Sequence, residues 1–190
     1  MIGALLAGGA GRRLTRGGRG KAAVELAGRP LAAYPLDALV AVCERVAVVC
    51  KPATVLPSLG SGVERWDEPA EPLHPVTGLA FALERAAGEV LVCAADMPFV
   101  DRAVFEAVKE AARGEPGASA VVAEAGGRLE PLLGVYRPSA LGLMRAAAGD
   151  ARLTVVVEGL DPVRVPVPAG TVRSVNTPHQ LAEAEAELAG

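Results

Sequence analysis

Aromatic residues are scarce in this sequence, making up only 3% of its 190 residues. The core must therefore be built from alanine, valine and leucine. Hydrophobic residues account for 51% of the chain and charged residues for 22%, a balance that excludes a disordered protein and predicts a soluble globular one. The length suits one well-packed domain and is short for two, so we expect residues 1–190 to form a single domain.

Cysteine and histidine are also rare. The three cysteines, Cys43, Cys50 and Cys93, are far apart and form no CxxC pair, which argues against a zinc site or a disulfide framework. Buried free thiols in a reducing cytoplasm are the simpler interpretation. The two histidines, His74 and His179, have no serine or cysteine nucleophile nearby, so we expect surface or supporting roles rather than a catalytic triad.

The chain lacks a long apolar segment and a large net charge. The apolar run at residues 2–7 is too short for a signal peptide or a membrane span, which predicts a cytoplasmic protein. A net charge of -3 and a pI near 5.5 argue against nucleic acid or a membrane surface as the main partner. The basic residues are instead concentrated near the N-terminus, at Arg12, Arg13, Arg16, Arg19 and Lys21.

Short apolar segments alternate with segments of helical periodicity, and this alternation predicts an α/β fold with helices on both faces of a mostly parallel sheet. Ligands of such sheets bind at the carboxyl ends of the strands. We expect strands at 1–6, 46–50, 63–66, 90–95, 118–123, 129–136, 155–157 and 163–167, and helices at 31–42 (with Pro30 in the first turn), 76–87, 102–113, 140–148 and 178–188.

A glycine-rich loop with many cations, at residues 8–21, directly follows the first predicted strand. Glycine allows close approach of backbone amides to phosphate oxygens, so a polyphosphate is the first ligand to consider. The loop is not a Walker A motif, because Thr15 replaces its first glycine and Ala22 follows Lys21. It is not a dinucleotide fingerprint either, because Leu14 replaces the third glycine. The alternative is a flexible surface loop.

A single carboxylate, Asp96, follows the most apolar predicted strand, in the sequence Ala94-Ala95-Asp96-Met97-Pro98-Phe99. Mg²⁺ in nucleotide-processing sites is held by one or two carboxylates together with phosphate oxygens and water. The end of this strand would face the same crevice as the glycine-rich loop. In the alternative interpretation, Asp96 caps the helix that begins near Arg102 or only ends its strand.

Several motifs together carry a resemblance to a known family. The LAGGxGxR pattern of residues 6–13, Lys21 and the LxGRPL pattern of residues 26–31 resemble the signature of Rossmann-like nucleotidyltransferases. With Pro75-Val76-Thr77-Gly78-Leu79, AADMPF at 94–99 and Asn176-Thr177-Pro178, the chain resembles the molybdenum cofactor guanylyltransferases. The resemblance implies a Rossmann-like three-layer sandwich that uses Mg²⁺. It also implies transfer of GMP from GTP to the terminal phosphate of molybdenum-molybdopterin, which yields the guanine dinucleotide cofactor and pyrophosphate.

The resemblance also assigns roles to residues. It implies a nucleotide-binding half at about 1–100, an acceptor-binding half at about 101–190, and transient contact with other cofactor-biosynthesis proteins as an open possibility. It implies that the nucleotide is bound by Leu6, Ala7, Gly8, Gly9 and Asp67, its phosphates by Lys21 with Arg13, the magnesium ion by Asp96, and the pterin by Asn176.

The sequence departs from the family pattern in two places. Gly9 and Lys21 are further apart than usual, so either Lys21 or Arg19 fills the family lysine position; normal spacing onward to the LxGRPL motif favours Lys21. A family asparagine after the second strand has no counterpart around Cys50-Lys51.

Alternatives to this assignment stay open at the level of the sequence. For Asp67, a solvated loop carboxylate is the alternative. Rival functions are a CTP-dependent molybdopterin cytidylyltransferase, a cobinamide-phosphate guanylyltransferase and a non-catalytic nucleotide-binding adaptor.

Overall fold

The computed structural model describes residues 1–9, 21–147 and 151–189. Its centre is a seven-stranded sheet in the order β5-β4-β1-β6-β8-β7-β9. The strands are β1 (Ile2–Leu6), β4 (Arg45–Cys50), β5 (Val63–Asp67), β6 (Val90–Ala94), β7 (Ala120–Ala125), β8 (Arg128–Tyr136) and β9 (Val163–Pro166).

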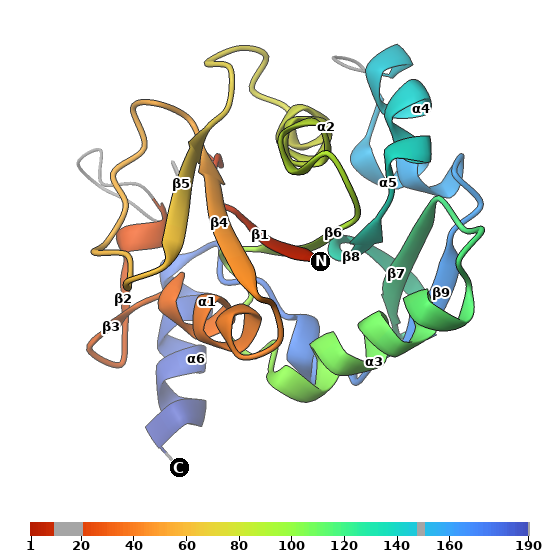
Figure 1. Ribbon diagram of the computed structural model, residues 1–190. Coiled ribbons are helices and arrows are strands. Elements are labelled where there is room, and N and C mark those ends of the chain that lie inside the picture. Colours follow the sequence, from red (N-terminus) through yellow and green to blue (C-terminus); the bar gives the residue numbers. More distant parts are fainter. Residues whose placement is uncertain (10–20, 148–150, 190) are drawn as a thin grey trace.

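Helices cover both faces of this sheet, which confirms the predicted three-layer α/β architecture (Figure 1). One face carries α2 (Pro75–Ala86), α4 (Leu141–Ala146) and α5 (Leu153–Glu158). The other carries α1 (Ala33–Val40) and α3 (Arg102–Gly114), with α6 (Pro178–Ala189) beside α1.

The two halves of the sheet differ in strand direction. The first half, β5-β4-β1-β6, is parallel throughout, so the carboxyl ends of these strands share one edge. In the second half β8 runs antiparallel to both β6 and β7, while β9 is parallel to β7. The β7–β8 hairpin turns at Gly126 and Gly127, whose φ angles of 56° and 75° lie in the left-handed region that glycine adopts without strain. The prediction of a mostly parallel sheet is confirmed.

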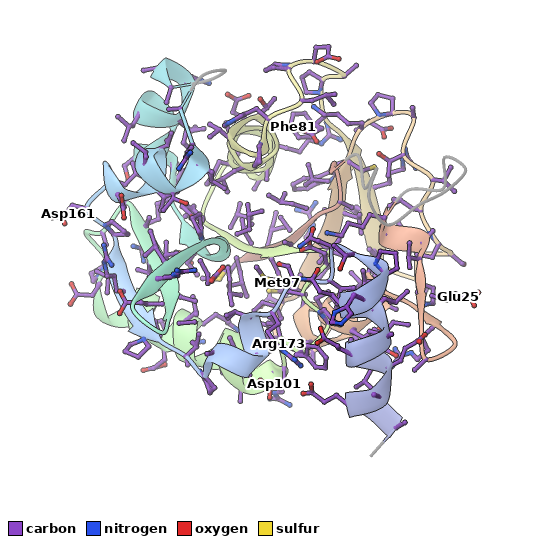
Figure 2. The ribbon with its side chains drawn as sticks, turned by 180° about the vertical axis from the view of Figure 1, so that it is seen from behind. Glu25, Phe81, Met97, Asp101, Asp161 and Arg173 are labelled. Atoms are coloured by element: carbon purple, nitrogen blue, oxygen red, sulfur yellow. The ribbon has the colours of Figure 1, made fainter. Side chains whose placement is uncertain are left out.

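The apolar residues of the strands separate into two clusters, one on each face of the sheet. Leu5, Val48 and Phe105 belong to the cluster under α1 and α3, whereas Trp66 and Leu79 belong to the cluster under α2, α4 and α5. This separation follows from the alternation of side chains along a strand. Figure 2 shows side chains filling both layers.

One predicted strand is a helix. The valine-rich residues 155–157 lie in α5 rather than in a strand. β-branched residues favour strands, but helical spacing places Val156 and Val157 on the buried face of α5 while Val155 remains 57% exposed. Packing in the cluster that also contains Leu153 overrides the local preference.

Pro30 was expected in the first turn of a helix and lies instead in a two-stranded hairpin. The strands are β2 (Glu25–Leu26) and β3 (Arg29–Pro30), and Pro30 pairs with Glu25. The turn is formed by Ala27 and Gly28, which both have positive φ angles of the kind that two-residue hairpin turns require. Helix α1 therefore begins later, at Ala33.

The other predicted elements are confirmed with small shifts of their ends, including the short third strand, now β5, and the closing helix, now α6. Across the described ranges 1–9, 21–147 and 151–189, no helix combines the length and apolar character needed to cross a membrane.

Candidate active site

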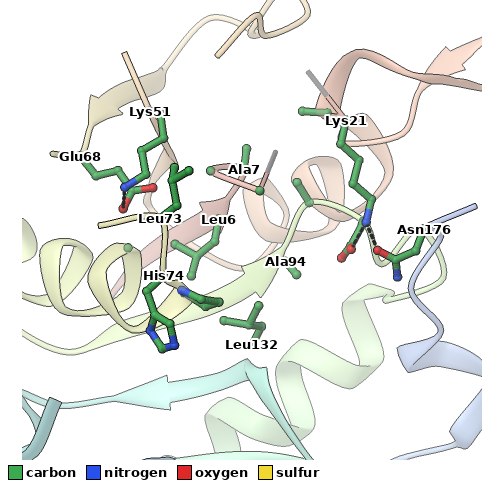
Figure 3. Close-up of a pocket in the computed structure, with 17 residues that line it drawn as sticks. Leu6, Ala7, Lys21, Lys51, Glu68, Leu73, His74, Ala94, Leu132 and Asn176 are labelled. Carbon is green, nitrogen blue, oxygen red and sulfur yellow. Dashed lines mark hydrogen bonds and ion pairs between the residues drawn. The ribbon is translucent and has the colours of Figure 1, made fainter. Parts of the chain in front are cut away.

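A cavity of about 500 Å³ opens at the carboxyl ends of β1, β4 and β6 (Figure 3). This volume lies within the range typical of small-molecule sites, roughly 300–1,000 Å³. Segments that are far apart in sequence contribute to its wall. The lining residues are Leu6, Ala7, Gly8, Gly9, Lys21, Ala22, Lys51, Glu68, Leu73, His74, Pro75, Gly78, Ala94, Ala95, Asp96, Leu132 and Asn176.

The glycine-containing end of β1 is held between its two neighbouring strands. The Ala7 amide donates to the Val49 carbonyl at 2.8 Å, and the Ala95 amide donates to the Leu6 carbonyl at 3.0 Å. These bonds extend the sheet beyond β1 and fix the backbone that leads into Gly8. The floor of the cavity is therefore rigid, as binding with little loss of conformational entropy requires.

Lys21, Asp96 and Asn176 converge at one end of the cavity (Figure 3). The Lys21 ammonium, from the short 3₁₀ helix η1 (Lys21–Ala23), donates to Asp96 Oδ2 and to Asn176 Oδ1. The side chains of Lys21 and Asp96 retain 13% and 20% exposure, so this ion pair remains accessible to a ligand. The structure thus brings together three residues that the sequence placed in one site.

Asn176 reaches this cluster because the C-terminal segment is tied to the end of β6. The Val175 amide donates to the Asp96 carbonyl at 2.9 Å. The backbone N–H of Asn176 donates to Gln180 Oε1 at 2.8 Å. At the start of α6, the backbone N–H of Gln180 donates to Thr177 Oγ1 at 3.2 Å. The beginning of α6 therefore holds Asn176 next to Asp96.

Asp96 does not cap the following helix. Asp101 does, because its Oδ1 accepts a hydrogen bond of 2.9 Å from the Val104 amide at the start of α3. The alternative interpretation of Asp96 as an N-cap is therefore wrong, and its carboxylate faces the cavity instead.

The donor set at Asp96 fits a magnesium ion that is held mainly by its substrate. Across the described parts of the chain, no three His, Cys, Asp or Glu side chains form a metal-binding group. A preformed protein cage is therefore not the type of site present there. Magnesium in nucleotide sites uses one or two carboxylates and takes its remaining ligands from phosphate oxygens and water. Asp96 beside Lys21 meets that requirement.

A second lysine–carboxylate pair lies at the other end of the cavity. Lys51 Nζ is 3.4 Å from Glu68 Oε2 and donates to the carbonyls of Pro69 at 2.6 Å and Pro72 at 3.0 Å. Only 8% of Lys51 and 4% of Glu68 are exposed. Burial raises the pKa of Glu68, and the charge of Lys51 offsets that rise only in part.

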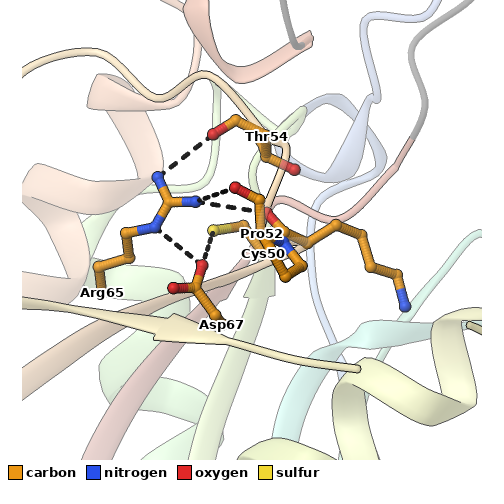
Figure 4. A network of polar contacts seen from close by, with 6 residues as sticks. Cys50, Pro52, Thr54, Arg65 and Asp67 are labelled. Atoms are coloured by element: carbon orange, nitrogen blue, oxygen red, sulfur yellow. Dashed lines mark hydrogen bonds and ion pairs between the residues drawn. The ribbon is translucent and has the colours of Figure 1, made fainter. Parts of the chain in front are cut away.

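Asp67 lies next to Glu68 in sequence and points to the opposite side of the sheet. Its Oδ1 accepts a 2.9 Å hydrogen bond from Arg65 Nε and a 3.8 Å contact from the Cys50 thiol (Figure 4). Its side chain is 50% exposed and does not line the cavity. Trp66 is buried on the α2 side, so alternation along β5 puts Glu68 on that side and Asp67 on the other.

Among the lining residues that sequence reasoning missed, the polar or charged ones are Lys51, Glu68 and His74. His74 caps α2, since its Nδ1 accepts a 3.3 Å hydrogen bond from the Val76 amide. The proline at the first helical position, Pro75, was a usable signal for that cap. Alternation from Trp66 indicates only the side of the sheet on which Glu68 lies, not that it meets Lys51.

Arg13, to which the family resemblance assigns a role at the phosphates, lies outside the described residues. Arg137 donates to the carbonyls of Ala112, Glu115 and Ala118 at and beyond the C-terminal end of α3, so its guanidinium is used to hold that helix.

The crevice suits a nucleoside triphosphate, because a rigid glycine-containing strand end, a lysine and a carboxylate of the kind that can hold a metal ion line the same cavity. Fold and site together define the nucleotidyltransferase class. Residues 3–164 match the family described as the MobA-like NTP transferase domain.

Full-length relatives narrow the class further. The chain is 33% identical to a molybdenum cofactor guanylyltransferase of Cereibacter sphaeroides, over 99% of this chain and 97% of that protein. It is 31% identical to a probable molybdenum cofactor guanylyltransferase of Mycobacterium bovis, over 87% of this chain and 83% of that protein. The chain therefore belongs to the MobA-like NTP transferases and, within them, to the molybdenum cofactor guanylyltransferase family.

Solved structures agree on the fold. The molybdopterin-guanine dinucleotide biosynthesis protein A of Archaeoglobus fulgidus superposes with a TM-score of 0.78 at 27% identity, and the match covers 100% of this chain and 99% of that one. The 2-C-methyl-D-erythritol 4-phosphate cytidylyltransferase of Thermus thermophilus has a TM-score of 0.70 at 22% identity, over 100% of this chain and 99% of that one. The second likeness shows the fold alone.

Proposed function

We propose that the protein transfers GMP from GTP to the terminal phosphate of molybdenum-molybdopterin, forming the guanine dinucleotide cofactor and releasing pyrophosphate. The convergence of Lys21, Asp96 and Asn176 beside the glycine-containing end of β1 is the observation that carries this proposal. Family membership supplies the identity of the two substrates.

The availability of the two lysines decides how GTP lies in the cavity. Its triphosphate belongs at the Lys21 end, where the ammonium contacts, among the described residues, only side chains that line the cavity, whereas Lys51 is already bonded to the carbonyls of Pro69 and Pro72. The backbone at Gly9 can lie close to the nucleotide, because nothing among the described residues lies within 4 Å of the place its Cβ would take, whereas the corresponding space at Gly8 is filled by the Glu68 carboxylate. Leu6 and Ala7 complete the wall along which the nucleoside lies.

Asp96 is the residue that would hold magnesium, with nucleotide phosphate oxygens as the other ligands. Bound there, the ion supplies Lewis-acid stabilisation of the negative charge on the phosphates. The Lys21 ammonium then exchanges its contact with Asp96 for phosphate oxygens, and Asn176 orients it through the hydrogen bond to Oδ1.

The reaction needs no amino-acid nucleophile. The terminal phosphate monoester of molybdopterin is already anionic at neutral pH and attacks the α-phosphorus of GTP, and pyrophosphate leaves. The protein must position the two substrates and neutralise charge, the terms that dominate phosphoryl transfer. We assign charge neutralisation on the leaving pyrophosphate to Lys21, and to Arg13 as carried over from the family pattern.

The acceptor is assigned to the C-terminal half, from about residue 101 onward. Asn176 links that half to the nucleotide site, because it contacts Lys21 and precedes α6. Leu132, from β8, lines the cavity from the same half. Asp67, 50% exposed at the end of β5, stays a predicted nucleotide residue whose contact requires the ligand to reach the rim of the cavity.

Pyrophosphate release tests the proposal. The full chain is supplied with molybdenum-molybdopterin, Mg²⁺ and each of the nucleoside triphosphates in turn. We expect release with GTP that depends on both the acceptor and the metal. Release with CTP in preference to GTP would replace the guanylyl assignment with a cytidylyl one. No release with any triphosphate would favour a non-catalytic nucleotide-binding adaptor.

A further inference from the structure

The Glu68 carboxylate occupies a specific recess at the end of the cavity away from Lys21. A Cβ on Gly8 would lie 2.2 Å from Glu68 Oε1, and a Cβ on Gly78 would lie 3.1 Å from Oε2. In this position the carboxylate leaves no room for a side chain at residue 8 and little room for one at residue 78. Gly8 comes from the end of β1 and Gly78 from α2, so two separate elements make room for it.

This buried acid is incompletely satisfied. Glu68 Oε2 is enclosed and accepts no hydrogen bond, and its ion-pair contact with Lys51 Nζ is 3.4 Å long. Lys51 is held by the carbonyls of Pro69 and Pro72, so it provides a fixed positive charge rather than a close donor. Desolvation raises the pKa of Glu68 despite that charge. A buried polar group without a partner costs free energy, and a ligand that donates hydrogen bonds would recover it.

The two ends of the cavity can be assigned to different parts of a nucleotide. Lys51 and Glu68 lie at the end opposite Lys21 and Asn176, with Leu6 and Ala7 between them (Figure 3). The triphosphate is placed at the Lys21 end, because Lys51 at the other end is already bonded to the carbonyls of Pro69 and Pro72. The base of the same nucleotide then points towards Glu68.

We infer that Glu68 is the residue that selects guanine. Its carboxylate accepts hydrogen bonds from N1–H and from the exocyclic amine of the base, and Lys51 positions this carboxylate and stabilises its negative charge. This inference rests on the proposed function, because it takes GTP as the nucleotide. No role in base selection follows for Glu68 or Lys51 from the family motifs, and Lys51 occupies the region in which the family asparagine has no counterpart.

The chemistry of the bases explains the selectivity. An ionised carboxylate only accepts hydrogen bonds. Guanine presents two adjacent donors on one edge, N1–H and the amine, whereas the corresponding edges of adenine, cytosine and uracil place an acceptor beside each donor. Glu68 lines the cavity, and accepting from both donors requires its carboxylate to turn about the terminal torsion, which is broad in glutamate. A site built to accept from a donor rejects analogues that lack it.

Nucleotide binding by the full chain, without the pterin substrate, tests the inference. Isothermal titration calorimetry compares GTP with inosine triphosphate, which differs only by lacking the exocyclic amine. A hydrogen bond to a charged group predicts that the wild-type protein binds GTP about 10- to 100-fold more tightly than inosine triphosphate. In Glu68→Gln this ratio should fall to near one, since the amide keeps the size of the side chain and loses the acceptor-only character.

Two further variants make the result decisive. Glu68→Asp keeps the charge beside Lys51 but withdraws the oxygens by one methylene, and it should also lose the preference for GTP. Glu71→Gln, the same chemical change on an exposed residue of the same loop, should keep the wild-type ratio. Melting temperatures establish whether each variant is folded. If Glu68→Gln does not fold, the comparison of the wild type with Glu68→Asp provides the test.

The outcomes separate this inference from the proposed function. A wild-type preference for GTP that is unchanged in both Glu68 variants would overturn the role of Glu68 alone. A wild-type preference for CTP over GTP would overturn the assignment of GTP itself.

Discussion

The cavity contains the same pair of residue types twice, and the two pairs differ in burial. At one end Lys21 pairs with Asp96, with side chains that are 13% and 20% exposed. At the other end Lys51 pairs with Glu68, with side chains that are 11% and 5% exposed. The partners of Lys21 are two side chains that line the cavity, whereas Lys51 is also fixed by two backbone carbonyls.

This difference in burial suits the two ion pairs to different roles. An accessible pair can be exchanged, so Lys21 can turn to phosphate and Asp96 to a metal ion during a reaction cycle. A buried pair with backbone contacts cannot be exchanged cheaply, because removing one member leaves an uncompensated charge inside the protein. The Lys21–Asp96 pair is therefore suited to chemistry, and the Lys51–Glu68 pair to recognition.

The largest effect is expected from a substitution that removes the carboxylate of the accessible pair. Asp96→Ala removes the residue proposed to hold the metal and should reduce pyrophosphate release by roughly 10³-fold or more, since metal stabilisation of a phosphoryl transition state amounts to several kcal/mol. GTP binding should fall much less, because the backbone near Gly8 and the base contacts remain. Calorimetry and a pyrophosphate assay measure the two quantities separately.

Asp101→Ala is the matched control for Asp96→Ala. It removes a nearby carboxylate that caps α3 and should cost about 1 kcal/mol of stability without a comparable loss of turnover. Equal losses of binding and turnover in Asp96→Ala would contradict the role of Asp96 in the chemical step.

Lys21→Met should have the next largest effect on activity. Loss of a charge that stabilises the leaving pyrophosphate predicts a decrease in kcat of roughly 10²- to 10³-fold. The free energy of unfolding should change less than it does in Lys51→Met, because the carboxylate left unpaired, Asp96, is more exposed than Glu68. Steady-state kinetics and urea denaturation test both expectations. A large loss of stability with unchanged kcat in the folded fraction would reverse the assignment.

Lys51→Met breaks the buried pair and should show the opposite balance. It leaves the Glu68 carboxylate enclosed without its counter-charge, which predicts a loss of about 3 kcal/mol in the free energy of unfolding. The Lys51→Met, Glu68→Gln double variant should recover part of that loss, since the unpaired charge is then removed. Urea denaturation of the wild type and of both variants measures the loss of unfolding free energy and its recovery. No recovery would show that the carbonyl contacts of Lys51 dominate.

The smallest expected effect is a pH dependence of stability. The pKa of Glu68 in the folded state is raised above its ordinary value of 4.5, so the folded protein holds this proton more tightly than the unfolded chain does. The corresponding stabilisation is fully present below pH 4.5 and is lost as pH rises through the folded-state pKa.

The comparison with Glu68→Gln isolates this effect. The difference in unfolding free energy, wild type minus variant, should decrease as pH rises from 4.5 towards neutrality. Urea denaturation at several pH values measures it. An increase over that interval would mean that Lys51 holds the pKa of Glu68 below its usual range.

The accessible end of the cavity could be predicted from the sequence, and the buried end could not. Lys21, Asp96 and Asn176 each lie in a recognisable motif, and the rule that ligands bind at strand carboxyl ends brings the first two together. Lys51 and Glu68 lie outside any motif. They meet because β5 pairs in parallel with β4, with Cys50 opposite Asp67, and a pairing register between distant segments cannot be read from local patterns.

The same limit explains why two secondary-structure predictions were wrong. The strand predicted at residues 155–157 followed β-branched propensity, but the position of α5 is decided by the apolar cluster that it completes. Pro30 was placed by its tolerance of a first helical turn, whereas the structure uses it in the β2–β3 hairpin. Segments with strong periodicity or full apolar character, such as those forming α3 and β6, were predicted correctly because local pattern and tertiary position agree there.

A crystal structure of the protein with GTP and Mg²⁺ tests the division of work between the two pairs most directly. The account predicts the metal on Asp96, the Lys21 ammonium on phosphate oxygens, and the edge of the guanine base within hydrogen-bonding distance of Glu68. A triphosphate bound at the Lys51 end, or a metal ion held away from Asp96, would contradict it.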